Sequence, residues 1–235
     1  MDHFIRIYHE EAVAYHAMIA REDVDQQVRG ALVDNGALQA QRLLDLGTGT
    51  GRIPLLFHAD IPHIVAFDLH EAMLREHQRQ RALVNGQWPL LQGDMRHLPF
   101  TNAEFDLVTA GWALGHFCGW YGDNWQVEMH HVLTEMRRVV QPGGQVIIME
   151  TLSTGSLEPR PPTPELARYY AWLEGDWGFQ RRELQTDYQF ATPEDAVAHA
   201  EFFFGPELAA AIRANGWARL PEWTGFWRWQ APASS

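Results

Sequence analysis

Short apolar runs alternate with helical patterns along the middle of the chain, and no other feature constrains the fold as strongly. Each run ends in small or acidic residues, and a helical segment follows most of them. The runs span residues 42–46, 64–67, 90–91, 105–109 and 145–149, and the helical segments span 53–59, 71–83 and 125–140. Strands and helices that alternate in this way form a mostly parallel sheet covered on both faces. The sequence therefore predicts an α/β fold.

The regions on either side of this core predict further helices and two late strands. Helical periodicity over 5–33 ends at Asn35-Gly36, and helices are also expected at 165–178, 194–203 and 207–214. The proline-rich stretch 151–164 is expected to form an exposed loop. Strands predicted at 187–190 and 222–230 would add an antiparallel edge to the parallel sheet.

The 235 residues fit a single domain over positions 1–235. Within it we expect N-terminal helices at 1–38, a ligand-binding core at 39–151, a lid or substrate segment at 152–205, and a final helix and edge strand at 206–235.

The composition excludes several classes of chemistry. All eighteen basic residues are arginines, so the chain cannot form a lysine Schiff base or use the lysine of a P-loop. Cys118 is the only cysteine, which excludes internal disulfides and all-cysteine metal sites. His130 and His131 are adjacent on a predicted helix and point to different faces, so no metal site is expected.

Charge and hydropathy indicate which partners to expect. The net charge of −12 argues against a nucleic-acid partner, because binding phosphates requires clustered cations. The chain has neither a secretory signal nor an apolar stretch of about 18 residues, so we expect no membrane insertion and a cytoplasmic location. The expected partner is a small molecule, and the sequence is also compatible with a homodimer.

The segment LLDLGTGTGR, at residues 43–52, is the strongest local motif. A strand leads into three alternating glycines, the first of them Gly47, which allow a tight turn and close approach of a ligand. The dinucleotide pattern G-x-G-x-x-G does not fit, because its third glycine would fall on Arg52 or Pro54. Asp45 would repel a pyrophosphate and suits a ligand with a cationic end, such as S-adenosylmethionine. The alternative is that the glycines serve only to form a turn and bind no ligand.

Two further acidic residues follow later strands. Asp68 ends the second run, seventeen residues after Gly51, near the spacing at which a carboxylate binds a ribose. Its alternative role is to cap the helix that begins near Glu71. Asp94 follows the third run, where its carboxylate can accept a hydrogen bond from an adenine amine. An Asx turn before Pro99 is the alternative for Asp94.

Together these motifs resemble those of the class I S-adenosylmethionine-dependent methyltransferases, in the broad group that includes ubiquinone-biosynthesis enzymes. The matching stretches are DLGTGTGR (45–52), AFDLHEAML (66–74), GDMRHLPF (93–100), FDLVTAGWALGHF (105–117) and EMRRVVQPGGQVIIME (135–150), in the family's order. The resemblance implies a Rossmann-like seven-stranded sheet of order 3-2-1-4-5-7-6, with strand 7 antiparallel and helices on both faces.

The resemblance also implies which residues bind S-adenosylmethionine and its product S-adenosylhomocysteine. Residues 47–49 would contact the methionine part, 68–69 the ribose and 94–95 the adenine, whereas 110–112 would lie beneath the methionine. The N-terminal helices would fold over the cofactor, although plain helix packing is the alternative there. The expected cofactor site is Tyr15, Arg21, Asp45, Gly47, Thr48, Gly49, Asp68, Leu69, Met73, Asp94, Met95, Ala110, Gly111 and Trp112.

The implied reaction is in-line transfer of a methyl group to a small-molecule acceptor, which depends mainly on holding the reacting atoms in line. His116 is the candidate general base, with loop packing or contact with the cofactor end as its alternatives. Four aromatic residues are expected in a lid over an apolar or aromatic acceptor, with core packing or a dimer surface as alternatives. They are Tyr169, Tyr170, Trp172 and Trp177.

Other functions stay open at this stage. The chain could be a non-catalytic S-adenosylmethionine-binding sensor or partner subunit, or a methyltransferase that acts on protein or RNA. A nicotinamide-dependent enzyme is a more distant alternative. Oxygen, nitrogen and carbon acceptor atoms are all compatible with the sequence.

Overall fold

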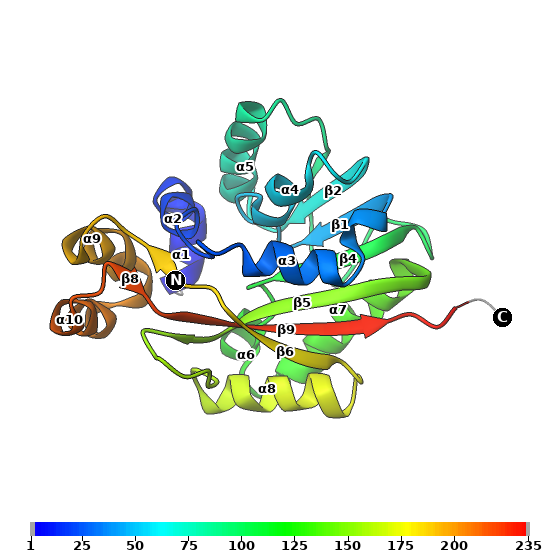
Figure 1. Cartoon of the computed structure of the whole chain (residues 1–235). Helices are drawn as coiled ribbons and strands as arrows, with labels where there is room; N and C mark the ends of the chain where they lie inside the picture. The colour runs from blue at the N-terminus through cyan, green and yellow to red at the C-terminus, as the bar shows by residue number, and fades with distance from the viewer. Residues whose placement is uncertain (1–2, 234–235) are drawn as a thin grey trace.

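The central element is a mixed sheet that, within the described residues, has seven strands (Figure 1). The structure is a computed structural model that describes residues 3–233, and the outermost positions of the predicted domain, 1–2 and 234–235, lie outside them. The strands of this sheet are β1 (Arg42–Leu46), β2 (His63–Asp68), β3 (Leu90–Gln92), β4 (Phe105–Gly111), β5 (Val140–Thr154), β6 (Gln180–Gln185) and β9 (Glu222–Gln230).

The strand order is β3-β2-β1-β4-β5-β9-β6. Strand β9 is the seventh of these strands along the chain, and it pairs antiparallel with both β5 and β6. The predicted order 3-2-1-4-5-7-6 with an antiparallel seventh strand is therefore confirmed.

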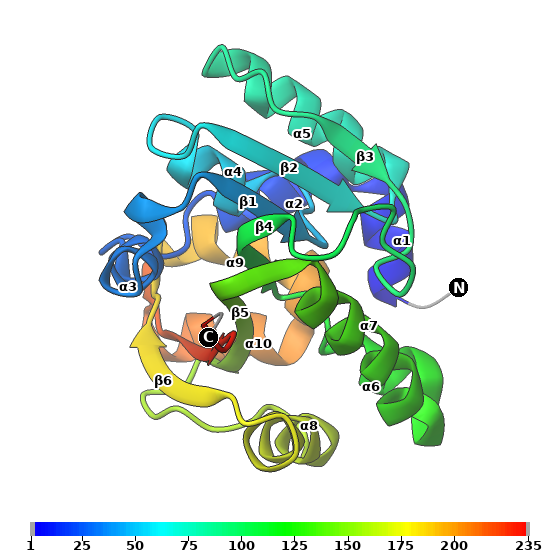
Figure 2. The ribbon, with the colours of Figure 1, turned by 90° about the vertical axis from the view of Figure 1, so that its right-hand side faces the viewer.

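Helices cover both faces of the sheet, as Figure 2 shows end-on. On one face, α3 (Gln27–Asp34) and α4 (Arg52–Phe57) contribute Val28, Leu32 and Phe57 to a core with β1 and β2. On the other face, α6 (His116–Tyr121), α7 (Trp125–Val139) and α8 (Pro164–Gly175) pack against β4, β5 and β9. Coverage on both faces explains why the inner strands are nearly continuous apolar runs.

The predicted strand at 187–190 is wrong as a member of the main sheet. Residues Tyr188–Gln189 form β7, which pairs only with β8 (Arg219–Leu220) in a separate two-stranded sheet. The sixth strand of the main sheet is instead β6, an edge strand in which only Leu184 is buried. Edge strands tolerate charged residues, so the segment QRRELQ has no apolar pattern that would predict a strand.

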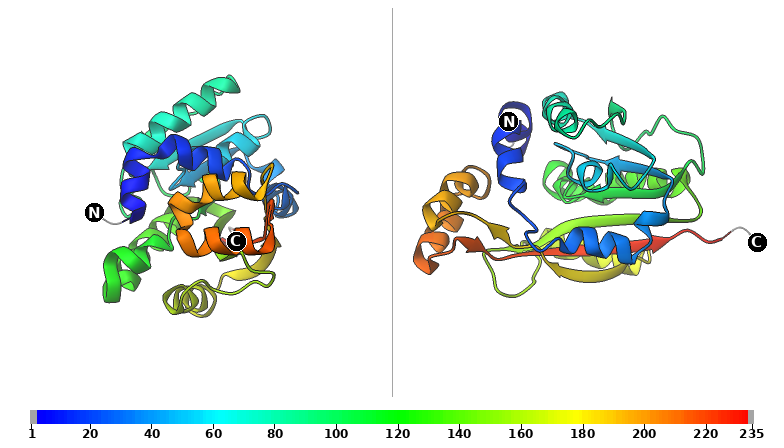
Figure 3. Two further views of the ribbon diagram at one scale, coloured as in Figure 1. Left: turned by 90° about the vertical axis from the view of Figure 1, so that its left-hand side faces the viewer. Right: turned by 45° about the horizontal axis from the view of Figure 1, so that its top comes forward.

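A cap sits at the carboxyl ends of the central strands. It combines α1 (His3–Glu10) and α2 (Ala12–Ile19) with α9 (Pro193–Phe204) and α10 (Pro206–Asn215) from the other end of the chain. Figure 3 shows these four helices gathered at the same end of the sheet. Met18 and Ile19 of α2 pack into a core with α9 and α10, and α1 and α2 also contact α5 (Glu71–Leu83). Short 3₁₀ turns at Ala37–Gln39 and Gly122–Asn124 complete the fold.

Candidate functional site

The predicted residues converge at the carboxyl ends of β1 to β4, beneath α1, α2 and α6. There the described residues form a half-open cavity of about 860 Å³, counting its mouth. The sequence-predicted residues that line it are Tyr15, Gly47, Thr48, Gly49, Asp68, Leu69, Met73, Asp94, Met95, Gly111, Trp112 and His116.

The glycine loop that follows β1 requires its glycines for two reasons. Gly47, Gly49 and Gly51 have φ values of 61°, 53° and 98°, in the left-handed region that favours glycine. A Cβ atom on Gly47 would lie 2.5 Å from the Cβ of Ala113, so the loop also lacks room for a side chain there. The exposed backbone of the loop therefore forms one wall of the cavity.

Asp68 joins the end of β2 to this loop. Its Oδ2 accepts a hydrogen bond from the Gly49 N–H at 2.7 Å, and its Oδ1 accepts one from the His70 N–H at 2.8 Å. Burial raises the pKa of the Asp68 carboxyl to about 6, against the effect of these hydrogen bonds. Each carboxylate oxygen can accept a second hydrogen bond, so the carboxylate retains capacity for a ligand.

Asp94 lies on the cavity wall in an ion pair with Arg96. The Nε of Arg96 is 3.0 Å from both carboxylate oxygens, and a second nitrogen donates to Oδ2 at 2.5 Å. These hydrogen bonds lower the pKa of Asp94. Arg96 also donates to Glu128 at 2.5 Å. The Asp94 carboxylate is thus held in place as an anion, and its contact with adenine stays a prediction.

The arginine that follows the glycine loop, Arg52, lines the cavity, whereas the predicted Arg21 does not. Arg52 lines the cavity, forms a 2.9 Å ion pair with Glu22 and stacks on the Trp112 ring at 3.8 Å. Its Nη2 is buried and has no hydrogen-bond partner in the described residues. Arg21 instead donates to the backbone oxygen of Ala17 and is absent from the cavity wall.

Asp45 and Ala110 lie behind the glycine loop and do not line the cavity. Asp45 faces Thr109 on the neighbouring strand β4, and the Thr109 hydroxyl donates to Asp45 Oδ1 at 2.6 Å. Burial raises the pKa of Asp45 to about 7. Its visible role is therefore to connect β1 to β4 beneath the loop.

Aromatic side chains from α1, α2 and α6 surround the mouth of the cavity. The Tyr8 hydroxyl and His116 Nε2 share a hydrogen bond of 2.7 Å, in which either group can be the donor. His116 also stacks on Trp120, with ring centroids 5.0 Å apart. Tyr15 lies over the loop, and its ring is 4.0 Å from the point that a Cβ atom on residue 49 would occupy. His116 is thus fixed at the cavity edge by contacts with two elements.

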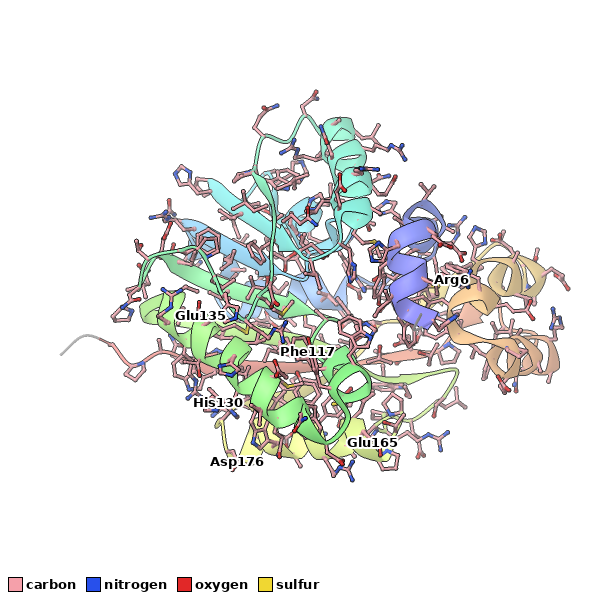
Figure 4. The ribbon with its side chains drawn as sticks, turned by 180° about the vertical axis from the view of Figure 1, so that it is seen from behind. Arg6, Phe117, His130, Glu135, Glu165 and Asp176 are labelled. Carbon is pink, nitrogen blue, oxygen red and sulfur yellow. The ribbon has the colours of Figure 1, made fainter. Side chains whose placement is uncertain are left out.

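The four aromatic residues expected in a lid lie elsewhere. Tyr169, Tyr170 and Trp177 are buried in the core under α8, where Trp172 packs against them, and none of the four lines the cavity. Figure 4 shows α6, marked by Phe117, between α8 and α1. Of the segment 152–205, the part that reaches the cap is α9, whose Phe203 packs 5.6 Å from the Tyr15 ring.

Sequence reasoning missed a second group of cavity residues. They are Tyr8, Ile19, Thr50, Arg52, His70, Arg96, Ala113, Phe117, Trp120 and Tyr121. Several directly neighbour a motif residue, so closeness to the motifs could have found them. Trp120 lies one turn after His116 on α6, so helical spacing could have found it, whereas Tyr8 carries no such signal, because the packing of α1 brings it to the site.

Residues 3–233 offer neither a metal-binding cluster nor a membrane-spanning helix. No group of three or more histidine, cysteine, aspartate or glutamate residues there could hold a metal ion. Within the same residues, no helix combines the length and apolar character that crossing a bilayer requires.

Comparison with known proteins agrees with this geometry. Residues 44–148 match a family described as "Methyltransferase domain". The chain carries a class I methyltransferase domain. A malonyl-[acyl-carrier protein] O-methyltransferase of Erwinia pyrifoliae is 34% identical over 61% of this chain and 48% of its own length. A demethylmenaquinone methyltransferase of Clavibacter sepedonicus is 35% identical over 55% of this chain and 46% of its own length.

This chain spans about half the length of these two curated relatives. Among solved structures, the YcgJ protein of Bacillus subtilis superposes with a TM-score of 0.56 at 16% identity, covering 87% of this chain and 98% of that one. This structural likeness supports the Rossmann-like fold.

Proposed function

We propose that this chain transfers a methyl group from S-adenosylmethionine to a small-molecule acceptor. One observation carries the proposal: Asp68 and the glycine loop form one wall of the cavity, joined by the Gly49 hydrogen bond at 2.7 Å. A carboxylate at this position suits the ribose hydroxyls of a nucleoside. The methyltransferase domain at 44–148 supports the same cofactor.

The residues present fit each part of this cofactor. Asp68 is available to the ribose hydroxyls, and the faces of Tyr8 and Tyr15 attract a cation. The buried, unpartnered Nη2 of Arg52 suits the methionine carboxylate. Asp94 and the neighbouring backbone are assigned to adenine.

When bound, S-adenosylmethionine supplies an electrophilic methyl group on a positively charged sulfur. The contribution of the protein is to hold the acceptor atom in line with that methyl group. His116 is the group assigned to remove a proton from acceptors that must lose one. Its hydrogen bond with Tyr8 and its stacking on Trp120 hold the ring at the cavity edge.

The test is thermal unfolding with S-adenosylhomocysteine. At about 100 times its Kd, the ligand should add about 2.7 kcal/mol of stability, which corresponds to a Tm increase of about 5–10 °C for a domain of this size. We expect Asp68→Asn to lose most of this increase, because the ribose hydroxyls lose their charged acceptor.

Asp106→Asn is the matched control. Asp106 also accepts two backbone N–H groups, from Gln41 at 2.9 Å and Arg42 at 2.7 Å, but it lies away from the cavity. The control should lower the Tm of the free protein and leave the ligand-induced increase intact. A wild-type protein that S-adenosylhomocysteine does not stabilise would contradict the proposed function.

A further inference from the structure

Helix α2 lies on the glycine loop, and two adjacent residues of the helix contact two adjacent residues of the loop. The ring of Tyr15 lies over Gly49. The Nδ1 atom of His16 and the hydroxyl of Thr50 share a hydrogen bond of 2.8 Å. Successive residues of a helix point about 100° apart, so the two contacts together fix how α2 is rotated on the loop. Tyr15 lines the cavity, whereas His16 lies outside the cavity wall that the described residues form.

The hydrogen bond between His16 and Thr50 lies where its loss is costly. Thr50 is buried and His16 is half-buried. A buried hydroxyl that loses its partner destabilises the arrangement that buries it. Either group can be the donor, because a neutral imidazole and a hydroxyl can each donate or accept. The hydrogen bond therefore favours the position of α2 on the loop.

Helix α5 belongs to the same junction. A Cβ atom on Gly51 would lie 2.4 Å from the His77 ring, so α5 packs directly against the loop. Burial lowers the pKa of His16, against the opposing effects of Glu76 and Gln80 on α5. Helix α2, the glycine loop and α5 thus meet at His16.

The last turn of α2 attaches the helix to the cap. Met18 and Ile19 pack into the core that α9 and α10 form. An isolated helix of eight residues is not stable in water, so the position of α2 is set by what it contacts. The apolar contacts hold α2 in the cap, and the hydrogen bond of His16 connects this cap to the glycine loop.

We propose that His16 is a positioning residue whose hydrogen bond with Thr50 holds α2 on the glycine loop and keeps Tyr15 over the bound nucleoside. The inference rests on the proposed S-adenosylmethionine site and names what keeps that site closed. When the hydrogen bond is lost, α2 leaves the loop more often and the nucleoside escapes faster. The dissociation rate of the nucleoside is therefore the quantity that His16 controls.

The test is a double-mutant cycle on the dissociation rate of S-adenosylhomocysteine, measured by surface plasmon resonance. We expect His16→Ala and Thr50→Val each to raise this rate about fivefold, the loss of one hydrogen bond. Because both substitutions remove the same bond, the double variant should also be about fivefold faster, and not about 25-fold. The rate belongs to the bound complex alone, so a smaller folded fraction of a destabilised variant would not change it.

Conservative variants and a second histidine separate the hydrogen bond from the fold. Thr50→Ser keeps the hydroxyl and His16→Asn places an amide near the position of Nδ1, so each should hold the rate within about twofold of the wild type. His199→Ala removes another half-buried imidazole of the cap, whose Nδ1 hydrogen-bonds the backbone oxygen of Asp195 within α9 at 2.9 Å, and should leave the rate unchanged.

The outcomes distinguish this inference from the proposed function. A rate for His16→Ala within about twofold of the wild type, or rates that multiply to about 25-fold in the double variant, would overturn the inference and leave the nucleoside site intact. If His16→Ala does not fold, equal rates for Thr50→Val and Thr50→Ser would overturn it. Absence of S-adenosylhomocysteine binding to the wild type would contradict the proposed function itself, and this inference with it.

Discussion

At the scale of single residues, each polar group of the site is held by a hydrogen-bond partner, which is local for Asp94 and distant in sequence for Asp68 and His116. Asp68 accepts from the glycine loop, Asp94 is bound by Arg96, and His116 is bound by Tyr8. Each functional atom therefore starts from a fixed position. For a reaction that depends on aligning three atoms, such fixation is a large part of what a protein can supply.

The pair of His116 and Tyr8 gives a prediction about the chemical step. If the acceptor must lose a proton, His116→Ala should lower kcat by about 10²–10⁴, the usual contribution of a general base. Affinity for S-adenosylhomocysteine should stay near the wild-type value. The measurement is the rate of S-adenosylhomocysteine formation at saturating concentrations of an acceptor found by screening.

His131→Ala is the control for His116, because His131 is exposed on α7 and lies away from the cavity. Tyr8→Phe should lower kcat less than His116→Ala, since it removes only the 2.7 Å hydrogen bond that orients the ring. A near-normal rate in His116→Ala would remove His116 as the base.

The residues that sequence predicted and those that it missed differ in how they reach the site. Gly47 directly follows β1 and Asp68 is the last residue of β2, so the chain itself brings them to the sheet edge. Tyr8 reaches the same place only through the contact of α1 with α6, which is far away in sequence. A pattern read along the chain contains no information on such contacts. Arg52 is intermediate, since it directly follows the loop but its ion pair depends on Glu22.

At the scale of elements, the predictions succeeded where periodicity was strong. The predicted bounds of β1, α5 and β9 are those of the structure. Strand β6 was missed because its edge position allows polar residues on both faces. The lid was assigned to aromatic residues of α8, but tryptophan and tyrosine serve a buried core as readily as a binding surface.

Removing an aromatic ring from α9 should therefore weaken ligand binding, whereas removing one from α8 should lower only the stability of the fold. Phe203 of α9 packs on Phe4 and Tyr15, with ring centroids 5.2 and 5.6 Å away. Phe203→Ala should weaken S-adenosylhomocysteine binding about fivefold, because Tyr15 loses its support above the glycine loop, and should cost about 1–3 kcal/mol of stability. Calorimetric titration and denaturant unfolding measure the two effects.

Trp172→Ala on α8 is the matched comparison. Trp172 packs against Trp125 and Trp177, with ring centroids 5.3 and 5.7 Å away. Its loss should cost about 2–3 kcal/mol of stability and leave nucleoside affinity unchanged. If Trp172→Ala weakened binding and Phe203→Ala did not, α8 rather than α9 would be the helix that supports the ligand site.

At the scale of the whole molecule, the strands that form the ligand site also carry buried acidic side chains. Burial raises the pKa of Asp68 to about 6, of Asp45 to about 7 and of Glu150 to about 8. In each case the folded chain binds a proton at pH values where the unfolded chain has released it. The stability that these three groups contribute should therefore fall as pH rises from about 4, the pKa of an unfolded carboxyl, to these folded values.

Glu150 offers the sharpest test of this pH dependence. It is buried on β5, and its Oε1 accepts from the Gly115 N–H at 2.9 Å. The pKa rise from 4.5 to about 8 corresponds to a loss of about 3–5 kcal/mol of stability as pH rises from 4.5 to about 8. Glu150→Gln keeps an acceptor for Gly115 without the charge, so its stability advantage over the wild type should be about 3 kcal/mol larger at pH 8.5 than at pH 5.5.

Urea unfolding at these two pH values measures the difference. The control is Glu183→Gln, which neutralises an exposed carboxylate on β6 and should follow the wild type at both pH values. Because Gly115 directly precedes His116, ionisation of Glu150 would act on the segment that carries the candidate base. Equal pH dependence in Glu150→Gln and the wild type would mean that this carboxyl stays ionised in the folded protein, despite its burial.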